Sequence, residues 1–149
     1  MKFKEKTYSV CVNLLTNKIN DLTLSLQDLI KSGDNDSKSS AGDKHETSRA
    51  MMQLEYEKIS FQLQKAEYEK KLLQEIDLKK KSQSIIKGSL VETDKGLFFL
   101  SVAIGGVVVG KQSIIVLSMQ SPLGQKLNGL KVNDVAEING LSYRIIRIL

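Results

Sequence analysis

Apolar residues in the N-terminal part of the chain recur at alternating intervals of four and three. Between about Glu5 and Lys31 this alternation has no break. A repeat that averages 3.5 residues is the signature of a helix that packs on another helix through a narrow seam. The members of this first seam are Tyr8, Val12, Leu15, Ile19, Leu22, Leu26 and Leu29. The pattern therefore predicts a long helix over this stretch.

A second seam with the same spacing follows, from about His45 to Lys81. Its members are Met52, Tyr56, Ile59, Leu63, Ala66, Leu73 and Ile76, with Lys70 at one polar position. Two helices joined by a short connection usually pair antiparallel within one chain. We therefore predict a monomer in which residues 1–82 form an antiparallel coiled-coil hairpin. A coiled coil between two copies of the chain is the alternative.

The segment between the two seams, residues 32–46, differs in composition from both of them. Its sequence is SGDNDSKSSAGDKHE, rich in residues whose side chains or backbone freedom compete with a helix. The segment has more acidic than basic side chains, although the whole chain has a net charge of +5. We predict that it forms an acidic loop at the tip of the hairpin.

Asp43 and Glu46 lie three residues apart where the second helix is expected to begin. This is the spacing of a capping box, in which the N-cap side chain accepts a hydrogen bond from the third amide while Glu bonds back. Two neighbouring carboxylates are also a usual source of ligands for a divalent cation. By spacing alone, helix capping is the favoured interpretation and metal binding is the alternative.

Other residues of the tip give weaker indications of a metal site. Asp34 and Asp36 begin like a calcium-binding loop, but Ser39 and His45 stand where that loop needs Gly and Glu. The calcium interpretation is therefore rejected. His45 next to carboxylates is a conceivable metal ligand, although a single exposed histidine is more often none.

After residue 82 the apolar period changes from that of a helix to that of short strands. Ser121 and Pro122 have the residue types of an N-cap and first position, so a short helix is expected through Leu127. Asn139-Gly140 is the signal of a type I′ hairpin turn. The expected strands are 85–92, 96–104, 113–118, 135–138 and 142–148. The predicted class is α+β, with residues 83–149 forming a small sheet domain with one short helix.

Several functions are excluded or limited by composition. The chain has one cysteine, Cys11, so it builds no disulfide framework, and a reducing cytoplasm fits. No apolar run approaches the length of a membrane span. GGVVVGK lacks the spacing of a phosphate-binding P-loop, and the sheet region has no catalytic constellation. The run 79–81, three lysines, is interpreted as the basic end of the second helix, or alternatively as a patch touching nucleic acid.

Four short motifs, in this order, resemble those of the bacterial Gre transcript-cleavage factors, GreA and GreB. They are Gly42-Asp43-x-x-Glu46, Ser121-Pro122-Leu123-Gly124, Gly129-x-x-Val132-x-Asp134 and Ser142-Tyr143-Arg144-Ile145-Ile146. The resemblance covers nearly the whole chain. It implies that the C-terminal domain is FKBP-like and docks on RNA polymerase, with residues 121–124 in the docking element.

The resemblance also implies a role for the tip. The hairpin would enter the secondary channel of RNA polymerase, where Asp43 and Glu46 match the two acids that help hold a second Mg²⁺. The protein would stimulate cleavage of backtracked transcripts near the RNA 3′ end. It would bind no cofactor alone and would not be an enzyme by itself, because the Mg²⁺ is shared with the polymerase.

Three positions depart from the usual Gre tip. Thr47 and Ala50 stand where the family has Asn and an aromatic residue, and Arg49 replaces an acid. Two alternatives therefore stay open. One is a Gre-like regulator that occupies the channel without stimulating cleavage. The other is a coiled-coil interaction module unrelated to polymerase.

Overall fold

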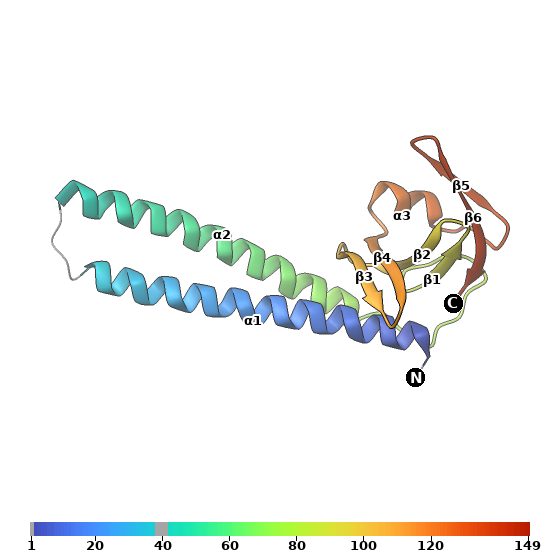
Figure 1. Cartoon of the computed structure of the whole chain (residues 1–149), viewed down its shortest axis with the longest axis horizontal. Helices are drawn as coiled ribbons and strands as arrows, with labels where there is room; N and C mark the ends of the chain where they lie inside the picture. Colours follow the sequence, from blue (N-terminus) through green and yellow to red (C-terminus); the bar gives the residue numbers. More distant parts are fainter. Residues whose placement is uncertain (1, 38–41) are drawn as a thin grey trace. The chain divides into compact units, whose positions relative to one another are not determined.

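The computed structural model describes the backbone of residues 2–37 and 42–149, and the side chains of residues 2–33 and 46–149. The chain forms two compact units. One is Leu14–Lys70, and the other combines Met1–Asn13 with Lys71–Leu149 (Figure 1). Among the described residues, no helix is long and apolar enough to cross a membrane.

The first unit is built from two antiparallel helices (Figure 1). Helix α1 spans Phe3–Ser37 and helix α2 spans Gly42–Gln74. Leu15, Ile59 and Ala66, which belong to the predicted seams, are buried. Leu24 and Leu54, which lie outside the seams, are 58% and 67% exposed. The predicted helical hairpin and the α+β class are therefore confirmed. The second seam differs at two members, because Tyr56 is 39% exposed and Ile76 lies beyond the end of α2.

The predicted loop at 32–46 is wrong for most of its length. Helix α1 continues to Ser37 and helix α2 already begins at Gly42. The reason is packing between the helices, since a Cβ on Gly33 would lie 3.2 Å from the Met52 Cε. Contacts of this kind outweigh the poor helix propensity of Asp, Asn and Gly. Residues 38–41, the remainder of the predicted loop, lie outside the described residues.

The predicted extension of the second helix to Lys81 is also wrong, because α2 ends at Gln74. The Asp77 carboxylate accepts a hydrogen bond from the Lys79 backbone N–H at 3.0 Å, which is an Asx turn that leads the chain away from the helix. Ile76 instead packs against Gly88, where a Cβ would lie 2.6 Å from the Ile76 Cγ2. The lysines at 79–81 therefore follow the helix and do not form its basic end.

In the described part of the chain, the second unit contains a mixed six-stranded sheet with the order β3-β4-β2-β1-β6-β5. Strands β2 and β4 pair parallel, and the other neighbours pair antiparallel. The strands are β1 (Leu90–Thr93), β2 (Gly96–Ser101), β3 (Gly105–Val109), β4 (Gln112–Ser118), β5 (Val135–Ile138) and β6 (Leu141–Ile148). Helix α3, Pro122–Leu127, connects β4 to β5.

The central strands β1 and β2 are buried on both faces. One core cluster gathers buried residues of the sheet and α3, including Phe98, Leu100, Leu127 and Ile145. The next residues along the same strands, such as Phe99, point to the opposite face and are buried too. Phe3 of α1 lines a small cavity on the sheet with Leu90 and Leu97. The first turn of α1 thus belongs to the sheet unit.

Most of the predicted sheet is confirmed, with three differences. The strand expected at 96–104 ends at Ser101. The first strand begins at Leu90 and not at Ile85, because Gly88 has a φ of 93° and the Ser89 hydroxyl accepts a hydrogen bond from the Ile86 N–H. Strand β3 was not expected, since its two glycines weaken the strand signal. The predicted turn at Asn139-Gly140 is confirmed by φ values of 51° and 78°.

Candidate functional site

The tip acids lie at the start of α2. Asp43 falls in the first turn of this helix and Glu46 three residues later, with the Glu46 side chain exposed. Because α2 begins at Gly42, Asp43 is inside the helix and not at the N-cap that a capping box requires. The side chains of Asp34, Asp36, Asp43 and His45 lie outside the described residues.

The spacing of Asp43 and Glu46 on a helix suits binding of a single cation by both residues. Residues three apart on a helix are neighbours on its surface, and carboxylates near a helix N-terminus are favoured by the macrodipole. Mg²⁺ in proteins commonly takes one or two carboxylates and completes its shell with water and substrate phosphate. Asp43 and Glu46 therefore fit a contribution to a shared ion. Among the described residues, no group of three or more His, Cys, Asp or Glu could hold a metal unaided.

A groove lies between α1 and α2, and its lining on α2 begins three residues after Glu46, at Arg49. It encloses about 320 Å³ and is lined from both helices by Leu29, Ile30, Gly33, Arg49, Met52, Gln53 and Tyr56. Arg49 lies three residues after Glu46 on α2, so a cation neighbours the acidic pair along the helix. The sequence marked Arg49 as a departure from the family but did not indicate that it lines a groove.

The second predicted site, Ser121 to Gly124, is the first turn of α3. The Ser121 hydroxyl accepts a hydrogen bond from the Gly124 N–H at 3.0 Å and donates one to the Ser118 carbonyl oxygen at 2.7 Å. Gly124 is buried, and Leu123 packs against the core cluster. Pro122 is the exposed member of the four. Ser121, Leu123 and Gly124 thus stabilise α3, and the docking role of this element stays a prediction.

The third motif also has a structural role. The Asp134 carboxylate accepts a hydrogen bond from the Lys131 N–H at 2.8 Å and closes the turn before β5. Gly129 has a φ of 83°, a conformation that favours glycine. These residues shape the connection from α3 to β5. The motif therefore marks a fold more directly than it marks a chemical site.

Exposed apolar side chains of the sheet unit were not singled out by the sequence. Val132, Val135, Leu141 and Ile146 are each between 45% and 49% exposed and lie on or next to β5 and β6. Val135 and Leu141 are at opposite ends of the β5–β6 hairpin register. The only signal for Leu141 and Ile146 was the incomplete alternation of apolar and polar residues in LSYRIIRI.

The described residues define an α+β protein with two units, a helical hairpin with acids at the start of its second helix and a mixed sheet with one short helix. Two solved structures are similar to it over most of their length. The structure of the transcription factor Gfh1 has 17% sequence identity, a TM-score of 0.36 and coverage of 92% of both chains. GreA factor homolog 1 (Gfh1) of Thermus thermophilus has 20% identity, a TM-score of 0.34 and coverage of 95% of this chain and 94% of that chain.

No protein-family model matches the sequence, and no curated protein matches it. The functional proposal therefore depends on the residues of this chain.

Proposed function

We propose that this protein is a Gre-type transcription factor that binds RNA polymerase as a monomer in the cytoplasm. Its hairpin enters the secondary channel, and its sheet unit docks at the channel rim. Asp43 and Glu46 then supply carboxylates to a Mg²⁺ ion shared with the polymerase. The factor stimulates hydrolysis of backtracked transcripts and has no nuclease activity alone.

The observation that carries this proposal is the position of the Gly-Asp-x-x-Glu segment. It occupies the first turn of the second helix of a hairpin, with Glu46 exposed. The Ser-Pro-Leu-Gly element supports the proposal, since its Ser121 and Gly124 have contacts that depend on those residue types. Both motifs belong to the four on which the resemblance to the Gre factors is based. They occur along this chain in the same order as in that family.

The residues of this chain have a limited chemical task. A second Mg²⁺ at the polymerase centre supplies neutralisation of phosphate charge and activation of a water molecule. Asp43 and Glu46 contribute acceptor oxygens and negative charge at one helix terminus. The hairpin positions these groups, because a helix holds two residues of this spacing more rigidly than a loop does. The polymerase and the transcript complete the site.

The direct test removes the charge of the two acids without changing their size. Asp43→Asn with Glu46→Gln should abolish stimulation of transcript cleavage in stalled complexes of purified polymerase, while binding to polymerase persists. Added Mg²⁺ should restore part of the activity, since a weaker site fills at higher concentration. Asp21→Asn with Asp28→Asn is a matched control, because both acids are exposed on α1 outside the tip and should not matter.

Arg49 supports a second candidate function, that of a regulator that enters the channel without stimulating cleavage. A guanidinium three residues from Glu46 competes electrostatically with a cation for the carboxylate. If this reading is correct, the wild type slows elongation without shortening transcripts, and the double variant of the acids behaves like the wild type. If polymerase is not bound at all, both candidates are wrong and the interaction-module interpretation replaces them.

A further inference from the structure

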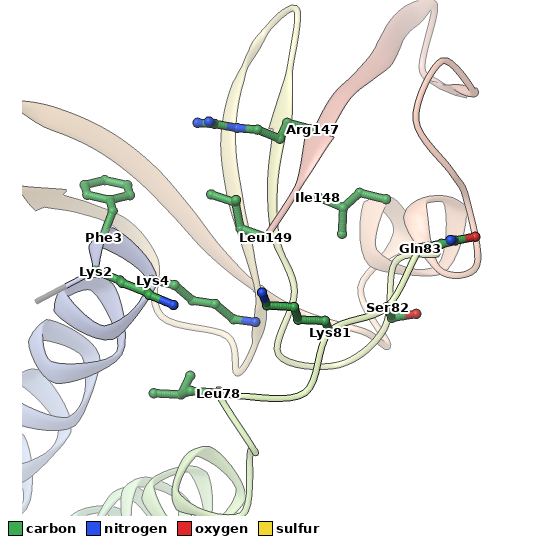
Figure 2. Close-up of a pocket in the computed structure, with 10 residues that line it drawn as sticks. All are labelled: Lys2, Phe3, Lys4, Leu78, Lys81, Ser82, Gln83, Arg147, Ile148 and Leu149. Carbon is green, nitrogen blue, oxygen red and sulfur yellow. The ribbon is translucent and has the colours of Figure 1, made fainter.

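A cavity of about 780 Å³ lies within the unit that combines Met1–Asn13 with Lys71–Leu149. Three segments line it: the start of α1, the chain that follows α2, and the end of β6 (Figure 2). Its volume falls in the range of small-molecule sites, roughly 300–1,000 Å³. The Ser121–Gly124 element is not among its lining residues.

The apolar part of the lining comes from Phe3, Leu78, Ile148 and Leu149. Phe3 and Ile148 are partly exposed, so their apolar surface remains available to a ligand. Phe3 is the one aromatic residue that lines the cavity. A flat group such as a nucleobase could therefore stack on its ring.

The polar part of the lining is strongly basic. Lys2, Lys4, Lys81 and Arg147 line the cavity, and no acidic side chain of the described residues does. The Arg147 Nε lies 3.2 Å from the Glu92 carboxylate, which offsets that cation. Within the described part of the chain, the three lysines form no ion pair. The positive end of the α1 dipole lies beside two of them and adds to the same potential.

The orientation of the lysines favours one ligand between them. Figure 2 shows the Lys4 and Lys81 side chains pointing into the cavity from α1 and from the segment after α2, whereas Ser82 and Gln83 point away. Burial lowers the pKa of Lys4, and the nearby charge of Asp77 opposes this effect only in part. A partly buried ammonium without a paired carboxylate is unfavourable, and a bound anion would remove this penalty.

We propose that this cavity binds a nucleoside polyphosphate, with its phosphates on Lys2, Lys4 and Lys81 and its base on Phe3. A polyphosphate carries several negative charges, which match three lysines without partners. Lysine is a common phosphate ligand that acts as a point charge. An apolar carboxylate would use the apolar lining but only one of the three cations, so it matches the cavity less well.

The test uses the purified full-length protein and GTP labelled with the fluorescent N-methylanthraniloyl group. The wild type should bind this probe, and unlabelled GTP and pyrophosphate should displace it. Lys4→Gln with Lys81→Gln should weaken binding by at least about tenfold, since each charge-assisted contact is worth about that factor. Lys111→Gln with Lys126→Gln is the matched control, because it removes the same charge from exposed positions outside the cavity.

Two further measurements locate the site and keep the test independent of folding defects. In the wild type, GTP should shift the amide NMR signals of Phe3, Lys81 and Leu149 more than those of the control positions. Phe3→Leu should weaken the binding of GTP more than that of pyrophosphate, because pyrophosphate has no base to stack on the ring. No probe binding by the folded wild type, or equal loss in both double lysine variants, would overturn the proposal. Displacement by decanoate but not by pyrophosphate would overturn it too, and none of these results depends on polymerase.

Discussion

Gly124 approaches the backbone of Ser118 so closely that a Cβ at position 124 would lie 2.1 Å from the Ser118 carbonyl oxygen. The same carbonyl accepts a hydrogen bond from the Ser121 hydroxyl, which also caps α3. The end of β4 and the first turn of α3 are therefore in close contact at Gly124 and the Ser118 carbonyl. A side chain at position 124 would force the two apart.

Gly124→Ala should destabilise the protein by about 1–3 kcal/mol or more, the usual cost of overpacking a well-packed site. The loss should appear as a lower denaturation midpoint in urea. Gly106→Ala is the control, because a Cβ at position 106 would have no neighbouring atom within 4 Å and Gly106 does not have a positive φ. If Gly106→Ala lowered the midpoint as much as Gly124→Ala, the close contact would not be the cause.

The two faces of α1 differ in what they contribute to stability. Leu15 is 3% exposed in the seam, whereas Leu24 is 58% exposed on the outer face of the same helix. Leu15→Ala should cost about 2–5 kcal/mol of unfolding free energy, since it leaves a cavity. Leu24→Ala should stay within about 0.5 kcal/mol. Helix propensity changes equally in both variants. The difference in their thermal unfolding, followed by circular dichroism, should therefore report the contribution of side-chain packing to stability.

Cys11 should be an inert thiol in the folded protein. Its side chain is fully buried, and burial raises the pKa of the thiol to about 11. At pH 8 only about one thiol in a thousand would then be a thiolate, the form that reacts with disulfide reagents. Ellman's reagent should therefore react slowly with the native protein and rapidly in concentrated guanidinium. Rapid reaction of the native protein would mean that this part of α1 opens readily.

Much of the fold could be predicted from sequence because its signals are local. The seams needed only a 3.5-residue period, and the Asn139-Gly140 turn needed two residues that tolerate positive φ. Errors occurred where distant contacts decided the outcome. Helix α1 continues past Gly33 because Met52 packs there, and the chain leaves α2 early while Ile76 packs on Gly88. No local pattern contains those partners.

The candidate sites were predictable to different degrees. Asp43 and Glu46 were recognised by spacing, yet Asp43 is the second residue of α2, which starts at Gly42, and not its N-cap. The basic cavity could not be predicted, since Lys4, Lys81 and Arg147 come from segments far apart in the sequence. Only the folded chain brings these cations together.

Asp94 links two distant segments of the sheet through a charge-dependent contact. Its Oδ1 accepts a hydrogen bond from the Arg144 N–H at 2.9 Å, and its own N–H donates to the Arg144 carbonyl at 3.1 Å. The first of these bonds is the main reason that the pKa of Asp94 is lowered, and the Lys95 ammonium at 3.6 Å contributes further. The carboxylate is thus favoured over the acid in the folded state.

A lowered pKa gives Asp94 a stabilising effect that is fully present above the ordinary Asp pKa, about 3.9, and lost as pH falls through the folded value. Asp94→Asn keeps an acceptor oxygen for Arg144 but has no charge. The wild type should therefore be more stable than this variant at pH 6, and the difference should shrink below pH 4 in urea denaturation. Asp28→Asn, exposed on α1, is the control for general charge effects. A difference between wild type and Asp94→Asn that stayed constant from pH 6 to pH 3 would show that the neutral hydrogen bond, and not the charge, supplies the stability.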